Sequence, residues 1–323
     1  MDRLRRIVLC ASVVSLAPLA GQAQTFPDRP ISIVAGAAAG GPTDVISRIV
    51  AEAMAKHLPQ PVVVENTPPA NVGAQRVAQA RPDGYTLLMS NVGLAAGATL
   101  FRRLSFDTAT AFAPLGLVSD AAMTILARPG FPAEDMPTLV REINRRGDAL
   151  NMGTAGLASA ANLCGLLMQQ QAQNRVTIVA FRGTAPAITE LMAGRIDLLC
   201  DQATNTAPFI QDGRLRAYAV TSPARLPGLP NVPTTTESGA SGIVMSTWHG
   251  LFAPAGTPEA VQQRLNAALL AAMQDDRLRA RFAELQTAPA TPERASIAFH
   301  RRFHVEEIER WRPVIQAAGA YAD

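Results

Sequence analysis

Residues 31–44 read ISIVAGAAAGGPTD, and this stretch decides the fold. Ile31–Ala35 is a short apolar run that predicts a strand, and a turn of small residues follows it at 36–41. From Thr43 to Leu58, apolar residues recur at helical spacing. A strand that leads through a tight turn into a helix is the first half of a βαβ unit. We therefore expect a parallel sheet covered by helices.

The alternation of strand and helix continues directly after this stretch. Val62–Glu65 is β-branched and predicts a second strand, Val72–Ala80 a short helix, and Tyr85–Ser90 a third strand. The segment RPDG at 81–84 has the composition of a turn. The order βαβαβ predicts three parallel strands joined by crossover helices.

A second set of units follows along the chain. The extended segments and strands that we predict are Ala113–Val118, Thr124–Arg128, Leu150–Gly153, Thr177–Phe181, Ile196–Cys200, Leu215–Val220 and Met245–Ala253. A proline-rich loop precedes the last of these, at Pro223–Pro233. The helices that we predict are Thr138–Arg146, Ser159–Gln171, Pro186–Ala193, Pro258–Met273, Asp276–Leu285 and Pro292–Ala318.

The helices after Pro258 follow no strand of their own, so they must pack on elements made earlier. The simplest arrangement returns the chain to the first unit through extended crossings near Val118–Thr124 and Met245–Phe252. We thus predict an α/β fold of two lobes, with two crossing strands and a ligand cleft between the lobes. Lobe one would comprise residues 24–120 and 252–323, and lobe two residues 121–251. A length of 323 residues agrees with two cores rather than one.

The N-terminus has the three parts of a secretory signal peptide. Arg3, Arg5 and Arg6 form a basic start, Ile7–Leu19 is an apolar run, and Gly21-Gln22-Ala23 offers a small-x-small cleavage site. The apolar run is shorter than the ~20 residues of a spanning helix, although an uncleaved anchor is the alternative. We therefore expect a signal peptide at residues 1–23 and a mature protein in the periplasm.

Charge and cysteine content limit the classes of partner and chemistry. Removing residues 1–23 lowers the net charge from +3 to +1, so a nucleic-acid partner, which needs a basic face, is not expected. Cys164 and Cys200 remain after cleavage, each among apolar neighbours. An oxidising compartment permits a disulfide, but the sequence does not fix their distance, and we expect two buried free thiols.

Four loops join a strand to a helix and carry polar or small residues. They are Gly36–Asp44, Gly153–Ser159, Phe181–Thr184 and Cys200–Gln202. Unpaired N–H groups and the helix dipole make a helix start attractive to anions, so a carboxylate could be held there without a cationic side chain. Candidate contributors in the last three loops are hydroxyls from Thr154, Ser159 and Thr184, an aromatic wall from Phe181, and Asp201, which could accept from a ligand amine or cap the next turn.

Seven segments together resemble the motif series of Bug-type receptors, the periplasmic substrate-binding proteins of tripartite tricarboxylate transporters. They are FPDRP at 26–30, GGPTD at 40–44, PVVVEN at 61–66, RPDGYTLL at 81–88, FRG at 181–183, LPNVPT at 229–234 and WHGLFAPAGTP at 248–258. The resemblance runs in order over nearly all of the mature chain. It implies a two-lobe periplasmic-binding fold and carboxylate ligands held by backbone amides and ordered waters from the loop after the first strand.

Carried onto this sequence, the resemblance implies a ligand site with contributions from both lobes. The residues are Ala38, Ala39, Gly40, Thr43 and Asp44 in lobe one, with Asn91 nearby, and Thr154, Ser159, Thr184 and Asp201 in lobe two. The chain departs from the family pattern in three places. The first loop is GAAAGG rather than PFxPGG, the stretch after the second strand is shortened to residues 66–71, and Asn162 replaces a histidine. These changes predict a roomier and less aromatic pocket.

The histidines do not form a catalytic or metal-binding pattern. His249 lies beside Trp248 in the returning strand, and we expect it to be packed or to lie at the hinge. His300 and His304 have the i, i+4 spacing of metal ligands, but Arg301 stands where a zinc protease has glutamate. No Gly-x-Ser-x-Gly motif occurs in the sequence. We expect no metal and no cofactor.

The combined features predict a solute-binding protein and not an enzyme. It would capture a small carboxylate between its lobes, as a monomer, and deliver it to the membrane subunits of a transporter. The main alternative is a periplasmic sensing subunit that passes its ligand-bound state to a signalling protein. A weaker third alternative is a hydrolase or isomerase that uses Asp44, Asp201 or His249.

Overall fold

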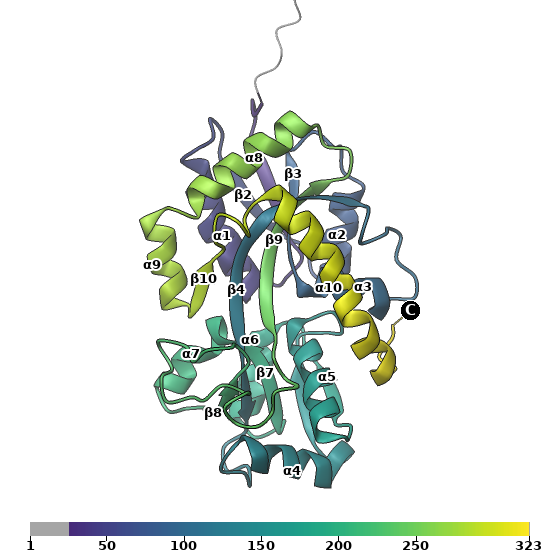
Figure 1. The fold of residues 1–323 in the computed structure, drawn as a ribbon, viewed down its shortest axis with the longest axis vertical. Coiled ribbons are helices and arrows are strands. Elements are labelled where there is room, and N and C mark those ends of the chain that lie inside the picture. The colour runs from purple at the N-terminus through teal and green to yellow at the C-terminus, as the bar shows by residue number, and fades with distance from the viewer. Residues whose placement is uncertain (1–25, 323) are drawn as a thin grey trace, which may run out of the picture.

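The computed structural model describes residues 26–322, and the expected signal peptide lies outside these residues. Two α/β lobes are stacked along the long axis of the molecule and are joined by two long strands (Figure 1). These strands are β4 (Phe112–Ala127) and β9 (Ser246–Pro254), which pair antiparallel. The predicted fold class, two α/β lobes with two crossing strands, is confirmed. No helix among residues 26–322 is long and apolar enough to cross a membrane.

The sheet of the first lobe has the order β2-β1-β3-β9-β4. The strands β1 (Ile31–Ala35), β2 (Val62–Asn66) and β3 (Thr86–Asn91) are parallel, as the βαβαβ order predicts. Strand β9 pairs antiparallel with β3. Since β9 enters from the second lobe, the parallel strands must run toward that lobe, and their carboxyl ends lie at the boundary between the lobes.

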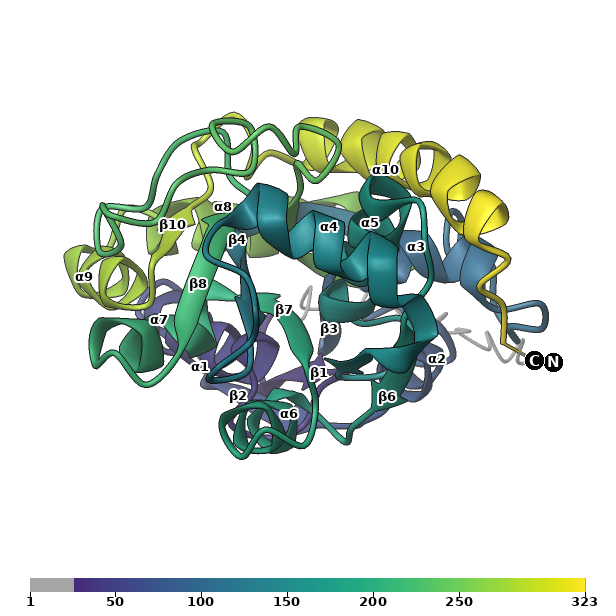
Figure 2. The same cartoon turned by 90° about the horizontal axis from the view of Figure 1, so that it is seen from below.

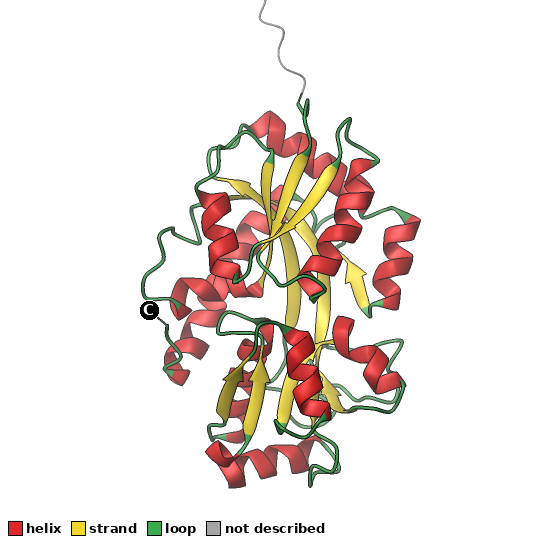
Figure 3. Cartoon of the chain, turned by 180° about the vertical axis from the view of Figure 1, so that it is seen from behind, coloured by secondary structure: helices red, strands yellow, loops and turns green. Residues whose placement is uncertain are grey.

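The second sheet repeats this pattern as β4-β7-β5-β6. Strands β5 (Asn151–Thr154), β6 (Thr177–Ala180) and β7 (Leu198–Gln202) are parallel to one another, and β7 is antiparallel to β4. These strands therefore run toward the first lobe. The carboxyl ends of both parallel sets meet at the lobe boundary, as the view from behind shows (Figure 3).

The helices cover both sheets. Those associated with the first sheet are α1 (Pro42–Ala55), α2 (Ala70–Ala78), α3 (Val92–Leu100), α8 (Glu259–Ala272), α9 (Asp276–Glu284) and α10 (Ile297–Ala318). Those of the second are α4 (Met136–Arg146), α5 (Ala160–Ala172), α6 (Thr184–Met192) and α7 (Ala203–Gln211), with α4 across the far end (Figure 2). The predicted return of the C-terminal helices is confirmed, since α8 contacts α1 and β4, while α10 contacts α3, β4 and also α5.

Strand β4 is one strand of 16 residues that continues through the predicted extended crossing, and the short strands β8 (Arg216–Val220) and β10 (Thr287–Pro289) pair with it. Three elements of the structure, α3, α7 and β10, were absent from the prediction. Helix α3 is apolar on nearly all sides and α7 contains Pro208, so neither shows an amphipathic period. The lobe limits at 120 and 251 stay a prediction.

A disulfide joins Cys164 to Cys200, with 6.1 Å between their Cα atoms, so the expectation of two free thiols is wrong. Helix α5, which carries Cys164, packs on β7, which carries Cys200. Both residues are fully buried. The pairing depends on which face of β7 is covered by α5, and sequence periodicity alone does not contain that information.

Candidate functional site

The two lobes touch at two glycines. A Cβ atom placed on Gly93, in the first turn of α3, would lie 2.0 Å from the carbonyl oxygen of Ala158 in the other lobe. A Cβ atom placed on Gly183, before α6, would lie 3.3 Å from the Cβ of Ala38. These contacts bring the loop after β1 and the start of α3 against the loops that follow β5 and β6. The loops at the strand ends of the two lobes are thus in contact.

The Asp44 carboxylate supports the loop after β1 through hydrogen bonds. Its carboxylate accepts hydrogen bonds from the Gly40 amide (2.8 Å) and the Asn66 side chain (3.0 Å), and it pairs with Arg48 (2.9 Å). Burial opposes ionisation of Asp44, but these three partners outweigh it and lower its pKa. Asn66 also donates to the Ala37 carbonyl oxygen. The predicted site residues Gly40 and Asp44 are therefore engaged with each other, while Ala38 and Ala39 form the outer part of the loop.

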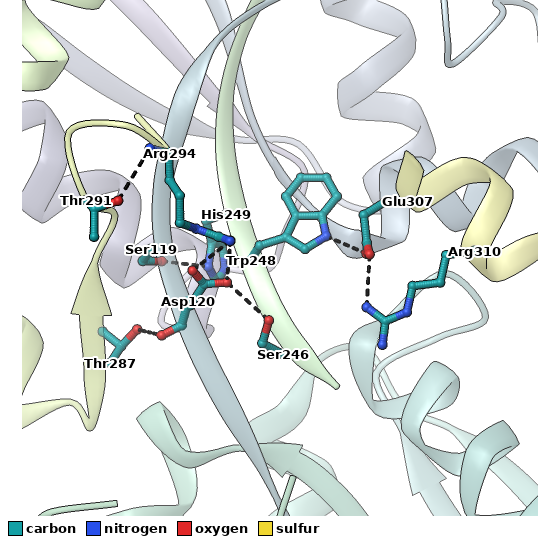
Figure 4. Close-up of polar contacts among 10 residues, drawn as sticks. All are labelled: Ser119, Asp120, Ser246, Trp248, His249, Thr287, Thr291, Arg294, Glu307 and Arg310. Atoms are coloured by element: carbon teal, nitrogen blue, oxygen red, sulfur yellow. Dashed lines mark hydrogen bonds and ion pairs between the residues drawn. The ribbon is translucent and has the colours of Figure 1, made fainter. Parts of the chain in front are cut away.

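A row of hydrogen bonds connects the start of α1 to both crossing strands. Asn91 donates to the Thr43 hydroxyl (3.2 Å), which lies 3.3 Å from Nε2 of His249. Nδ1 of His249 lies 3.0 Å from the Ser119 hydroxyl on β4 (Figure 4). The strand registers place Asn91 opposite His249, and His249 opposite Ser119. Because burial lowers the pKa of His249 to about 3, the ring is neutral and links the two hydroxyls without carrying charge.

In lobe two, Ser159 and Asn162 shape the loop that precedes α5. The Ser159 side chain accepts from the Asn162 amide (3.2 Å) and donates to the Gly156 carbonyl oxygen (2.6 Å). The Asn162 side chain donates to the Leu157 carbonyl oxygen (2.9 Å). Asn162, which replaces the histidine of the family pattern, thus hydrogen-bonds within the loop that precedes α5.

The loop before α6 contains the next candidates. Phe181 is half-buried against the core between β7 and α6, and Gly183 has φ of +111°, which favours glycine. Thr184 is buried at the first position of α6. The structure thus brings Thr184 to the same boundary as Ala38, through the adjacent Gly183.

Helices α1, α5 and α6 are among those that begin at the boundary between the lobes. Among residues 26–322, no acceptor is bonded to the first amides of α1, α5 and α6, namely those of Thr43, Asp44, Ala160, Ala161, Thr184 and Ala185. Each helix start also carries the positive end of a helix dipole. The boundary therefore offers N–H donors from both lobes to an anion.

The ends of β5 and β7 carry the remaining candidates, Thr154 and Asp201. Both are buried, and Asp201 accepts a hydrogen bond from the Gln202 amide through one carboxylate oxygen. Burial raises the pKa of Asp201 to about 7. No lysine or arginine among residues 26–322 forms an ion pair with it. Asp201 is thus a buried carboxyl group without a cationic partner among residues 26–322.

Neither histidine of the predicted i, i+4 pair faces solvent. Nδ1 of His300 accepts from the Gly116 amide (3.0 Å), and Nε2 of His304 donates to the Thr108 carbonyl oxygen (2.8 Å). Both rings pack against Phe252. Within residues 26–322, no group of three or more histidine, cysteine, aspartate or glutamate side chains is arranged to hold a metal ion.

Two α/β lobes joined by crossing strands, with helix starts from both lobes at the boundary, define the class of periplasmic-binding-fold receptors. Comparison with known proteins gives the family within this class. Residues 46–320 match the tripartite tricarboxylate transporter family receptor, and the chain belongs to this family.

Individual relatives agree with this assignment. A protein from the TAR-I ttuE-ttuC' intergenic region of Agrobacterium vitis is 39% identical over 321 residues, which cover 98% of this chain and 92% of that protein. The structure of the periplasmic binding protein BugD is similar with a TM-score of 0.86 at 35% identity, covering 92% of this chain and all of that one. MatC from Rhodopseudomonas palustris, with bound malate, gives a TM-score of 0.85 at 36% identity, covering 90% and 100%. These solved relatives are binding proteins.

Three residues with clear positions at the boundary were missing from the predicted site. Asn66 supports the first loop, and His249 and Ser119 connect Thr43 to the crossing strands. The placement of His249 in the returning strand agrees with the expected hinge or packing role. The available signal was a polar residue inside an otherwise apolar strand, because a buried polar side chain needs a partner.

Proposed function

We propose that this protein is a periplasmic receptor that captures a small carboxylate between its lobes and delivers it, unaltered, to the membrane subunits of a transporter. The observation that carries the proposal is the meeting of three helix starts, from α1, α5 and α6, at one boundary. Their free amides suit the oxygens of a carboxylate, and the family membership supports a transport role.

The binding mode follows from the groups at the boundary. In lobe one, the amides of the Ala38–Ala39 segment and of Thr43 would donate to the carboxylate. In lobe two, the first amides of α5 and α6 and the Thr184 hydroxyl would complete its shell. The bound malate of the relative MatC, at 36% identity, supports a ligand of this class for the present chain.

The proposal is tested by thermal unfolding in the presence of mono-, di- and tricarboxylates. A ligand at a hundred times its dissociation constant stabilises the folded state by ~2.7 kcal/mol, and each kcal/mol raises the melting temperature by roughly 2–4 °C in a chain of this size. We therefore expect a rise of about 5 °C or more with at least one carboxylate. The corresponding amide or methyl ester is the control and should have almost no effect.

Two outcomes would contradict this function. Stabilisation only by uncharged sugars or by cations would show that the proposed anion site is wrong, although the assignment of the fold would stand. Recovery of the ligand in a chemically changed form, measured by mass spectrometry after incubation, would instead indicate an enzyme.

A further inference from the structure

The crossing strand β4 has two neighbouring strands at the point where the chain passes between the lobes. Strand β10 pairs with residues 119–121 of β4, and the same residues pair with β9. Because a strand has two edges, β9 and β10 must lie on opposite edges of β4, as Figure 1 shows. Strand β9 is the one that connects β4 to β3 and β1. Strand β10 therefore lies across β4 from the loop after β1, which belongs to the proposed ligand site.

Polar side chains attach the segment that contains β10 to both crossing strands. The Thr287 hydroxyl donates to the carbonyl oxygen of Asp120 on β4 (2.9 Å). Arg294, which follows β10, pairs with the Asp120 carboxylate (2.9 Å), and this carboxylate also accepts from the hydroxyl of Ser246 on β9 (3.1 Å; Figure 4). Residues 287–294 thus form part of the hinge.

Gln286, directly before β10, contacts the second lobe. Its Oε1 accepts from the Gly228 amide (2.8 Å), while its Nε2 donates to the Ala283 carbonyl oxygen at the end of α9 (3.0 Å). Gly228 lies in the loop between β8 and β9. This loop is fixed to the second lobe, because Gln211 of α7 donates to the Gly228 carbonyl oxygen (3.0 Å) and Leu229 packs on α7 and β8. One side chain thus connects the hinge segment of the first lobe to a loop of the second.

The backbone at both ends of this contact is adapted to it. Gln286 has φ of +52°, a left-handed conformation that residues other than glycine rarely adopt, so its surroundings must hold it there. A Cβ atom placed on Gly228 would lie 2.3 Å from Nε2 of Gln286. Only glycine therefore leaves room for the Gln286 side chain in this position.

We propose that Gln286 is a latch between the lobes, which favours one angle between them from the side of the hinge that is remote from the ligand site. The Gln286–Gly228 hydrogen bond spans both lobes, so a rotation of one lobe against the other about β4 lengthens or breaks it. The latch acts without a ligand, and this inference does not rest on the proposed function.

The test measures the distance between the lobes in the ligand-free protein. Val63 on β2 and Ile178 on β6 have exposed side chains and belong to the sheets of different lobes. Each is replaced by cysteine and carries a nitroxide label, and pulsed electron spin resonance gives the distribution of distances between the two labels. Cys164 and Cys200 are bonded to each other and do not react, and Cys10→Ser removes the remaining thiol.

Two variants remove the latch from opposite sides. Gln286→Asn tolerates the left-handed backbone but is one methylene too short to reach Gly228, and Gly228→Ala displaces the Gln286 side chain. Since a single hydrogen bond is worth roughly a factor of five, each should raise the population at other distances by about fivefold. The double variant should exceed neither single one by much, because both remove the same contact.

Two further variants are controls for the latch. Gln286→Glu keeps an acceptor oxygen for the Gly228 amide and should retain the distribution of the unmodified protein. Gln263→Ala removes an exposed glutamine of α8 that bonds only to Glu259 of the same helix, and it should have no effect on the distances.

Unchanged distributions in both Gln286→Asn and Gly228→Ala would overturn the latch, and so would an equal change in Gln263→Ala. A lower melting temperature of the two latch variants without any change in distance would show that the contact only stabilises the fold, which also overturns the proposal. Because no ligand is present, none of these outcomes bears on the carboxylate receptor.

Discussion

At the scale of single residues, the start of α1 contacts a histidine from the crossing strand β9. Thr43 is one of the groups proposed to meet the ligand, and its hydroxyl lies between the side chains of Asn91 and His249. His249 in turn reaches Ser119 on the other crossing strand. A neutral ring in this position orients Thr43 through geometry, because burial keeps its pKa at about 3.

The first prediction is that His249 acts on binding through Thr43. His249→Ala should weaken carboxylate binding by about tenfold, as a buried hydrogen bond and its packing are lost. Thr43→Val should have a similar effect, and the double variant should be no worse than the stronger single one, because both remove the same contact. Titration calorimetry of this double-mutant cycle is the measurement.

His57→Ala serves as the control for this cycle, since His57 is exposed at the end of α1. It should change neither affinity nor stability by more than ~0.5 kcal/mol. Fully additive losses from His249→Ala and Thr43→Val would show that the two residues act separately. His249→Gln, which keeps a polar atom near Thr43, should recover part of the affinity.

At the scale of elements, helix α3 contacts the loop before α5 across the lobe boundary. The second prediction is that Gly93→Ala prevents full closure, because its Cβ would lie 2.0 Å from the Ala158 carbonyl oxygen. Alanine is also the better helix former by roughly 0.5–1 kcal/mol, so the ligand-free protein should be as stable as before or more stable. Ligand affinity should nevertheless fall by at least about tenfold.

Gly97→Ala, one turn further along α3, is the matched control for the Gly93→Ala variant. Its Cβ would meet only the ring of Phe101 at 3.7 Å, an ordinary contact, so its affinity should be unchanged. Small-angle scattering with and without ligand gives the second measurement. A normal compaction of Gly93→Ala on ligand addition would refute the closure role of this contact.

Helix α10 is fastened to the crossing strand β9 by one buried carboxylate. Glu307 accepts from Nε1 of Trp248 (2.8 Å) and pairs with Arg310 (2.9 Å), as Figure 4 shows. It also accepts from Nε1 of Trp311 (3.2 Å), and Arg310 donates to the Val244 carbonyl oxygen. On the other side of the hinge, Asp120 of β4 pairs with Arg294 in the segment before α10. The helix is thus tied to both crossing strands.

The third prediction concerns the stability of this attachment. Glu307→Ala should lower the free energy of unfolding by about 3–5 kcal/mol, since it leaves two indole N–H groups buried without an acceptor. Glu309→Ala on the same helix removes an exposed ion pair with Arg312 and should change stability by less than ~1 kcal/mol. Urea unfolding monitored by tryptophan fluorescence compares the two. Equal losses would show that the cost comes from the helix and not from the indole contacts.

Some elements of the fold could be predicted from the sequence, and others could not. Strands β1–β3 were predictable as short apolar or β-branched runs next to turn residues, and helix α1 was predictable because its apolar residues recur at helical spacing. Helix α3, with the sequence VGLAAGATL, has no polar face, because α2, α10 and β9 cover it. Strand β4 was predicted as two extended segments joined by an extended crossing, because Ser119 and Asp120 interrupt its apolar run. Their partners, His249 and Arg294, come from distant parts of the chain.

The same limit applies to the candidate site. The loops at 36–44, 153–159 and 181–184 were predictable, since small and hydroxyl residues between a strand and a helix have local meaning. The role of Asp44 was not, because its partners Gly40, Asn66 and Arg48 become visible only when α1 is packed on β2. The disulfide between Cys164 and Cys200 likewise depends on the docking of α5 on β7.

At the scale of the whole molecule, four buried groups link stability to pH. Burial lowers the pKa of His249 to about 3, and burial with the nearby His304 lowers that of His300 well below its usual value. Burial also lowers the pKa of His304, although the Thr108 carbonyl and Glu307 oppose this effect. Asp201 has the opposite behaviour, since burial raises its pKa to about 7. The histidines therefore bind protons on unfolding below pH ~6.5, while Asp201 releases one on unfolding above pH ~4.

The fourth prediction is the slope of stability against pH that these groups produce near pH 5. His249 and His300 each take up a proton on unfolding, His304 takes up as much as one more, and Asp201 offsets one. The net uptake of one to two protons makes the free energy of unfolding increase with pH by about 1.4–2.7 kcal/mol per unit. Asp201→Asn should steepen this slope by about 1.4 kcal/mol per pH unit, because the proton that Asp201 releases on unfolding is lost from the sum. His249→Gln should reduce the slope by the same amount, because the proton that His249 takes up on unfolding is lost. Urea unfolding at several pH values between 4.5 and 6 measures all three slopes. Equal slopes in the three proteins would mean that neither group changes its protonation on unfolding, and that Asp201 and His249 keep their ordinary pKa values inside the fold.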